Sequence, residues 1–335
     1  MKVLFLKFKS FKRCVGLTAF LLVSLVGFVR AQSVPVAVSA DEFRVTLLGT
    51  GSPSPVMRRF GPGVLIQAGG KTLLIDCGRG TTQRLLQSGL KLGQVDALFL
   101  THLHSDHVVG IPDLWLTGWL EASYAQRKGP FVVYGPTGTQ SLMNGLASAY
   151  QWDIKARIAD QNLSPANIAA QVTEFNEGVV YDQAGVKVTA IEVDHGDLLK
   201  PAFGFRVDYA GRSVTVSGDT RFSENLINKA QNTDLIIHQV AAARDELLAI
   251  PAFKLILAHH TQPSEAGIVF TRTKPKLAVY YHFVLLGTAN VPAMTEKEVF
   301  EQTRKTYDGP LLIGEDLMTF QINRDAVVVL PTRNP

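Results

Sequence analysis

The chain of 335 residues contains only two cysteines, Cys14 and Cys77, which excludes a disulfide-rich secreted domain. It also lacks collagen-like repeats and low-complexity segments, so it is neither a fibrous protein nor a disordered tail protein. Charged side chains make up 19% of the residues and hydrophobic ones 46%. This composition provides a buried core for one large or two ordinary domains, and it excludes a polytopic membrane protein.

Acidic residues are missing from the first 31 positions, which hold six cations. Five of the cations precede an uncharged run over residues 14–29, and Val29 and Ala31 occupy the −3 and −1 positions of a cut after Ala31. This layout predicts a secretory signal peptide over residues 1–31, a secreted or periplasmic location, and no stable membrane association after cleavage. An uncleaved anchor is the alternative, because the 16 uncharged residues fall just short of a membrane span.

The basic excess of the whole chain lies within this same segment. The formal charge is +4, but without the six cations 27 basic residues remain against 29 acidic ones, a net charge of −2. The high isoelectric point therefore does not indicate nucleic-acid binding. Residues 32–335 contain no linker, charge block or obvious repeat, so we expect them to form a single domain.

Short apolar runs alternate with segments of helical length along residues 42–335. The runs predict strands over residues 44–48, 64–68, 72–75, 97–100, 131–134, 186–193, 203–209, 213–216, 235–237 and 277–281. The periodic segments predict helices over residues 81–88, 112–126, 137–150, 263–271 and 295–307. Strands in both halves of the chain, each half followed by helices, indicate a layered α/β architecture.

The strongest chemical signal is a histidine-rich loop that follows the strand predicted over residues 97–100. It reads Thr101-His102-Leu103-His104-Ser105-Asp106-His107. Core packing does not require three imidazoles and a carboxylate together, whereas zinc binds both ligand types well. Residues two apart in an extended loop project to the same side, so His102 and His104 can hold one ion while Asp106 and His107 face another. A histidine-rich surface loop is the alternative.

This loop resembles the hallmark His-x-His-x-Asp-His motif of the metallo-β-lactamase superfamily, and later stations of that family also occur in order. They are His195 in Val-Asp-His-Gly, Asp219 in Ser-Gly-Asp-Thr and His282 in Tyr-Tyr-His-Phe. The resemblance implies a four-layer αββα sandwich with two zinc ions, although manganese or iron would also suit these ligands. It places His102, His104, His195 and Asp219 on one ion, and Asp106, His107, Asp219 and His282 on the other.

Within the superfamily the sequence is most similar to the ribonuclease Z and arylsulfatase-like branch. The similarity rests on Leu47-Leu-Gly-Thr-Gly-Ser-Pro53, on Asp234-Leu-Ile-Ile-His238, and on His260-Thr261 followed by Ser264-Glu-Ala-Gly267. It implies that His260 donates a proton to the leaving oxygen, and it supports a catalytic role for His238 and His259 less strongly. The chain departs from the family at Gln239, where an acidic partner is expected.

The resemblance implies a metal-dependent hydrolase in which a hydroxide bridges two zinc ions and Asp106 orients that nucleophile. A phosphodiesterase is the first choice, with an arylsulfatase or a β-lactamase outside the cytoplasm as alternatives and a non-catalytic metal-binding protein as a further one. Residues 151–180, compared with the basic arm that holds transfer RNA in this branch, carry a net charge of −2. We therefore expect a small-molecule ester or lactam as substrate rather than transfer RNA. The sequence leaves a homo-oligomer open.

Overall fold

The computed structural model describes residues 42–331, which belong to one compact unit. The predicted signal peptide over residues 1–31 lies outside the described residues. Within residues 42–331, no helix combines the length and the apolar character needed to cross a membrane.

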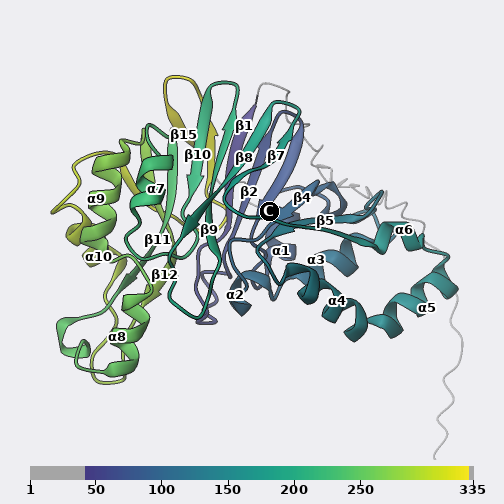
Figure 1. The fold of residues 1–335 in the computed structure, drawn as a ribbon, viewed down its shortest axis with the longest axis horizontal. Helices are drawn as coiled ribbons and strands as arrows, with labels where there is room; N and C mark the ends of the chain where they lie inside the picture. Colours follow the sequence, from purple (N-terminus) through teal and green to yellow (C-terminus); the bar gives the residue numbers. More distant parts are fainter. Residues whose placement is uncertain (1–41, 332–335) are drawn as a thin grey trace, which may run out of the picture. The chain divides into compact units, whose positions relative to one another are not determined.

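Two sheets form the centre of the described part of the chain (Figure 1). The first sheet has the strand order β15-β14-β1-β2-β3-β4-β5-β6. Its strands are β1 (Phe43–Gly49), β2 (Gly63–Ala68), β3 (Lys71–Ile75), β4 (Ala97–Phe99), β5 (Phe131–Gly135), β6 (Ala170–Glu174), β14 (Thr319–Ile322) and β15 (Val327–Leu330). Both ends of the described chain therefore enter the same sheet, where β1 pairs antiparallel with β14.

The second sheet has the order β13-β12-β11-β10-β9-β8-β7. Its strands are β7 (Gly178–Gln183), β8 (Val186–Val193), β9 (Ala202–Tyr209), β10 (Arg212–Val216), β11 (Leu235–Ala242), β12 (Leu277–Leu285) and β13 (Leu311–Ile313). Strands β10 to β13 run parallel to one another, and β7 to β10 pair antiparallel. The expected strands are confirmed.

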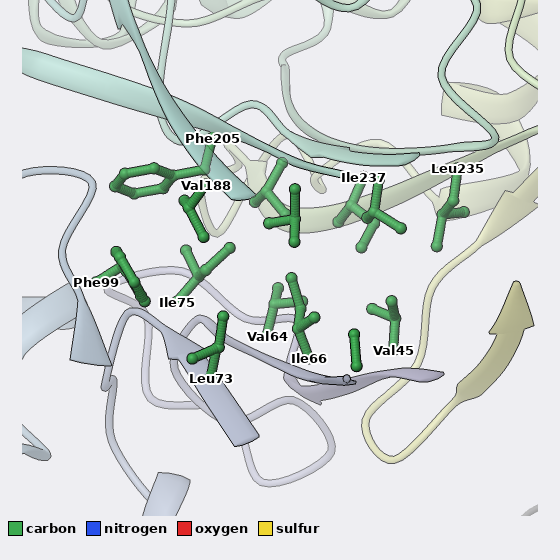
Figure 2. Packing of buried hydrophobic residues seen from close by; sticks show 14 of the residues in the cluster. Val45, Val64, Ile66, Leu73, Ile75, Phe99, Val188, Phe205, Leu235 and Ile237 are labelled. Atoms are coloured by element: carbon green, nitrogen blue, oxygen red, sulfur yellow. The ribbon is translucent and has the colours of Figure 1, made fainter. Parts of the chain in front are cut away.

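The core lies between the two sheets, which face each other through their apolar side chains (Figure 2). Val64, Ile66 and Ile75 of the first sheet point toward Phe205 and Ile237 of the second. All six residues of β2 are buried, and Leu65 belongs to a second apolar cluster on the other face. Such a strand must be covered on both faces, which accounts for its largely apolar sequence.

Helices cover the outer face of each sheet. The first sheet packs against α1 (Thr81–Gln87), α3 (Ile111–Gly118) and α4 (Thr139–Ala149), and the second against α7 (Glu224–Lys229), α9 (Pro263–Thr273) and α10 (Glu296–Thr303). Two sheets between two helical layers form the αββα sandwich that the family resemblance implied, so the predicted fold class is confirmed.

The helix predicted over residues 112–126 is shorter in the structure. Helix α3 ends at Gly118 because Arg127 occupies its carboxyl end: the Arg127 backbone N–H donates to the Gly118 carbonyl at 2.9 Å, and its guanidinium donates to the Trp115 carbonyl at 2.9 Å. Carbonyls at a helix end need such donors. Trp115 and Trp119 are buried in the cluster outside the first sheet, so they serve the core rather than a substrate cleft.

The loop that follows β1 is tied to the carboxyl-terminal part of the chain by one buried carboxylate. Asp316 accepts hydrogen bonds from the backbone N–H groups of Thr50 at 2.9 Å and Phe60 at 2.8 Å. Its second oxygen also pairs with Arg84 of α1 at 3.0 Å. The loop's conformation therefore depends on a residue more than 250 positions further along the sequence.

Candidate metal centre

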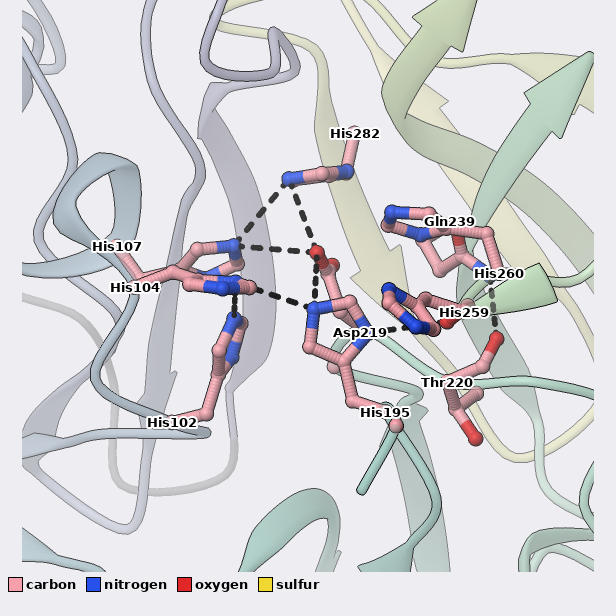
Figure 3. Close-up of polar contacts among 12 residues, drawn as sticks. His102, His104, His107, His195, Asp219, Thr220, Gln239, His259, His260 and His282 are labelled. Carbon is pink, nitrogen blue, oxygen red and sulfur yellow. Dashed lines mark hydrogen bonds and ion pairs between the residues drawn. The ribbon is translucent and has the colours of Figure 1, made fainter. Parts of the chain in front are cut away.

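Most of the predicted metal ligands lie just beyond the carboxyl ends of strands that meet at one edge of the two sheets. The His102–His107 loop follows β4 and includes the short helix α2 (Ser105–Val108), while His195 follows β8 and Asp219 follows β10. His282 lies within β12. Strand ends that meet at one edge bring side chains from distant parts of the sequence into a single site (Figure 3).

His282 owes its position to an irregularity in the sheet. Gln239 of β11 pairs with Tyr281, and the next residue, Val240, pairs with Phe283, so His282 is the extra residue of a β-bulge. Its φ angle of 45° lies in the left-handed region, which is unfavourable for a residue with a side chain. Strain of this kind persists where the surroundings impose it and is typical of functional sites.

The ligand atoms form two clusters, in each of which they lie within 4.8 Å of one another. The first cluster contains His102, His104, His195 and Asp219, and the second contains Asp106, His107 and His282. The carboxylate of Asp219 faces both clusters: its Oδ2 lies 3.7 Å from His195 Nε2, 3.6 Å from His107 Nε2 and 3.4 Å from His282 Nε2. The structure thus brings all seven predicted ligands together.

Ring nitrogens in these clusters face one another at short range. His104 Nδ1 lies 3.0 Å from His102 Nε2 and 3.1 Å from His195 Nε2, and in the second cluster His107 Nε2 lies 3.2 Å from His282 Nε2. A neutral imidazole carries only one N–H. The three nitrogens that meet in the first cluster, from His102, His104 and His195, therefore cannot all be satisfied by hydrogen bonds to one another. A shared cation satisfies all three lone pairs.

One further atom fits a metal centre. Asp219 Oδ1 is buried without a hydrogen-bond partner among the described residues. An orphaned carboxylate oxygen costs free energy unless it pairs with a cation or a water molecule. The donor set of imidazoles and carboxylates is also the set that zinc prefers in catalytic sites. The residues present therefore fit a pair of metal ions.

Asp76 is a functional residue that the motif analysis missed. It is buried at the end of β3 and accepts a hydrogen bond from His107 Nδ1 at 2.7 Å. It also accepts from the backbone N–H and the hydroxyl of Thr101, whose Oγ1 lies 2.9 Å from His102 Nδ1. One carboxylate thereby orients a ligand in each cluster, so that Nε2 of both rings faces the metals. Its position directly after a predicted strand was the available signal.

The remaining histidines have different surroundings. His195 Nδ1 donates to the His259 carbonyl at 3.0 Å, so a backbone group orients this ligand, whereas Asp194 pairs with Arg221. His260 Nδ1 donates to Gln239 Oε1 at 2.9 Å, and Gln239 Nε2 donates in turn to the Thr220 carbonyl. His238 is buried against Phe270 and belongs to the core.

Burial and neighbouring charges divide the histidines into two electrostatic classes. Burial, together with His107, lowers the pKa of His102 well below its ordinary value. Burial alone would lower the pKa of His107 too, but the carboxylates of Asp76 and Asp219 raise it well above its ordinary value. Although burial opposes it, His282 and His107 hold the pKa of Asp219 well below the usual range. Without a metal, His107 therefore carries the proton of the second cluster.

Comparisons with known proteins agree with this geometry. Residues 43–249 match the family model described as "Anti-Pycsar protein Apyc1". The chain is 34% identical over 281 residues to a ribonuclease Z of Mycolicibacterium gilvum (strain PYR-GCK), covering 83% of this chain and 96% of the relative. It is 35% identical over 284 residues to a ribonuclease Z of Mycolicibacterium paratuberculosis (strain ATCC BAA-968 / K-10), covering 83% and 98%.

Solved structures share the fold. The metallo-β-lactamase fold protein YhfI from Bacillus subtilis has a TM-score of 0.63 at 17% identity, covering 83% of this chain and 98% of that one. The short form of human tRNase Z has a TM-score of 0.61 at 23% identity, covering 84% and 99%.

These relatives overturn the expected partner. The expectation of a small-molecule ester or lactam substrate rather than transfer RNA is wrong, because the chain matches ribonuclease Z enzymes over nearly their whole length and shares its fold with a tRNase Z. The charge argument failed for a physical reason. Residues 151–180 form α5 (Gln151–Gln161), α6 (Pro165–Ile168), β6 and the start of β7, in which Ile168 is buried in the core and Ile154 and Ile158 pack against it. Their net charge therefore says little about the substrate.

The electrostatic contrast between the clusters predicts how zinc binding depends on pH. Zinc at the second cluster must displace the His107 proton, so its affinity should rise about tenfold per pH unit between about pH 6 and pH 8. Affinity at the first cluster should change less, because the lowered pKa of His102 leaves that ring unprotonated. Competition titrations against a chromophoric chelator at several pH values measure both dissociation constants.

Asp76→Asn supplies the matched control, since it removes one of the charges that hold the His107 proton. The pH dependence at the second cluster should flatten in this variant. Equal slopes for both ions in the wild-type protein would contradict the assignment of the proton to His107.

Proposed function

Because this chain belongs to the ribonuclease Z family within the metallo-β-lactamase superfamily, and to the family of the anti-Pycsar protein Apyc1, we propose that it is a zinc-dependent phosphodiesterase that cleaves RNA. The chain is a metal-dependent hydrolase of the ribonuclease Z-like type. The observation that carries the proposal is the carboxylate of Asp219 between two imidazole clusters, because a carboxylate shared by two metal ions suits phosphoryl chemistry.

Seven side chains would hold the two zinc ions. Asp219 serves both, His102, His104 and His195 complete one ion, and the other ligands are Asp106, His107 and His282. The bound ions would supply Lewis acidity and would lower the pKa of a water molecule toward neutrality.

Asp106 is suited to orient the nucleophile and to accept its proton. The side chain is buried, and its Oδ2 lies 3.2 Å from His282 Nε2. Although burial opposes it, the hydrogen bond from His282 and the charge of His107 lower the pKa of Asp106. The carboxylate is therefore ionised at neutral pH and available as an acceptor.

His260 would protonate the leaving oxygen through Nε2; in support, its Nδ1 is held by Gln239. Burial lowers the pKa of His260 to about 3, and the amide of Gln239 adds no charge behind the ring to raise it. The ring is therefore neutral before substrate binds. An anionic phosphodiester beside Nε2 supplies the missing negative charge, favours a proton on that atom, and thus couples proton uptake to substrate binding.

The activity is tested with a panel of substrates. Zinc-loaded protein should cleave a transfer RNA precursor or a single-stranded oligoribonucleotide, while nitrocefin and p-nitrophenyl sulfate should not be turned over. Asp106→Ala should reduce RNA cleavage by about a thousandfold, because it removes both a ligand and the proton acceptor. Turnover of the sulfate ester or the lactam without phosphodiester cleavage would refute the proposal, and so would wild-type rates in the variant.

The role of His260 is tested by the leaving group. His260→Ala should slow aryl phosphodiesters with poor leaving groups about a hundredfold and those with good ones much less, because only a poor leaving group needs the proton. A plot of log kcat against leaving-group pKa should therefore steepen. The half-buried His259 provides a control, since His259→Ala keeps the backbone carbonyl that orients His195. Equal slowing of all esters would contradict an acid role.

We also propose that residues 1–31 direct export and are removed. The support is the sequence layout of six cations, an uncharged run and a small residue at position 31. Mass spectrometry of protein recovered outside the cytoplasm should find Gln32 as the first residue. An intact amino terminus on the exported chain would favour the retained anchor.

A further inference from the structure

Helix α8 (Pro251–Ala258) leads directly into His259 and His260, yet few apolar contacts hold it in place. Leu257 is the one buried residue among its eight, and Leu255 is 60% exposed. Helices in proteins gain most of their stability from packing an apolar face, and α8 packs little of its surface. The place of its carboxyl end therefore depends on polar contacts.

Two side chains from the loops of the metal centre bind carbonyls at this helix end. Arg221 Nε donates to the Ala258 carbonyl at 2.6 Å. His195 Nδ1 donates to the His259 carbonyl at 3.0 Å (Figure 3). Carbonyls in the last turn of a helix have no partner within the helix, so they need such donors. The guanidinium also places a positive charge at the negative end of the helix dipole.

Arg221 is itself fixed to the loop that carries His195. Its backbone N–H donates to the Asp194 carbonyl at 2.8 Å, and its guanidinium pairs with the Asp194 carboxylate at 3.2 Å. Arg221 also follows the predicted ligand Asp219 by two residues. One side chain thus joins the loop after β8, the loop after β10 and the carboxyl end of α8.

The residue before Arg221 holds the other side of His260. The Thr220 carbonyl accepts a hydrogen bond from the Thr261 hydroxyl at 2.8 Å. His260 therefore lies between two points of attachment, Ala258 and Thr261, which are bound by consecutive residues of one loop. The place of the His260 backbone relative to the metal centre follows from these two contacts.

We propose that Arg221 is a positioning residue: by holding the end of α8 it places the His259 carbonyl, and through that carbonyl it orients the metal ligand His195. The same contact sets the distance of His260 from the metals. This second part rests on the proposed function, whereas the first concerns metal binding alone. Partners that orient metal-ligating histidines contribute about tenfold to a hundredfold to metal affinity. Arg221 acts on such a partner rather than on the ligand, so we expect an effect at the lower end of that range.

Zinc binding tests the first part, and Arg206 offers a matched control. Arg206 likewise donates to two carbonyls at the end of a helix, α7, and pairs with an aspartate, but α7 leads into the start of β11 rather than into the site. In chelator competition titrations, Arg221→Ala should weaken zinc binding at the first cluster about tenfold and at the second by less than about twofold, because only the first contains His195. Arg206→Ala should change neither constant. Equal weakening at both clusters, or none, would overturn the proposal.

Asp194→Asn separates the hold on α8 from the ion pair beside His195. The two side chains of this pair are 36% and 47% exposed, and exposed ion pairs contribute little. Asp194→Asn should therefore leave both zinc dissociation constants within about twofold of the wild-type values. A loss equal to that of Arg221→Ala would show that the ion pair orients His195, and it would overturn the role of α8.

The leaving group tests the effect on His260. At saturating zinc, Arg221→Ala should lower kcat for methyl phenyl phosphate about tenfold and for methyl p-nitrophenyl phosphate by less than about twofold, with KM little changed, because only the poor leaving group needs the proton. Equal slowing of both esters, or the same loss in Arg206→Ala, would overturn this part.

Circular dichroism and thermal melting verify that the variants are folded, and Arg221→Met, which keeps an apolar stem, replaces Arg221→Ala if the alanine variant does not fold. Failure of the wild-type enzyme to hydrolyse either ester would count against the phosphodiesterase proposal. The zinc dissociation constants would still decide whether Arg221 orients His195.

Discussion

The site depends on one electrostatic constraint: several imidazole lone pairs and two carboxylates are held close together, and every ligand except the exposed His104 is buried. His104 Nδ1 lies between the Nε2 atoms of His102 and His195 at about hydrogen-bond distance, yet the rings do not have enough protons to satisfy every contact. In the metal-free protein the proton of His107, held between Asp76 and Asp219, compensates part of this charge. A pair of divalent cations at these ligands would compensate this charge.

Much of the site could be predicted because most of its metal ligands lie in short sequence motifs. The loop from His102 to His107 carries four ligands within six residues, and the resemblance to the metallo-β-lactamase superfamily implied His195 and Asp219. Asp76 was missed because a single aspartate after a strand is common, and its role becomes visible only when His107 and Thr101 are seen to donate to it. The bulge that positions His282 depends on pairing between β11 and β12, which no local pattern reveals.

The fold shows the same division between local and long-range information. Central strands such as β2 and β11 were predictable because burial on both faces favours largely apolar runs, such as residues 64–66 and 235–237. The end of α3 was not, since Arg127, which caps its carbonyls, lies nine residues beyond Gly118. The prediction of the substrate class failed for a similar reason. The net charge of residues 151–180 was interpreted as that of one surface arm. Isoleucines in this stretch pack in or against the core.

The tie between Asp316 and the loop after β1 has a consequence for how the chain acquires its shape during synthesis. A ribosome makes β1 and the following loop early, but the carboxylate that holds Thr50 and Phe60 is not made until nearly the whole chain has been translated. Strand β1 likewise cannot pair with β14 until β14 has been synthesised. The amino-terminal sheet therefore keeps an unpaired edge throughout elongation, and a nascent chain of this kind benefits from a chaperone that shields that edge until the last residues emerge.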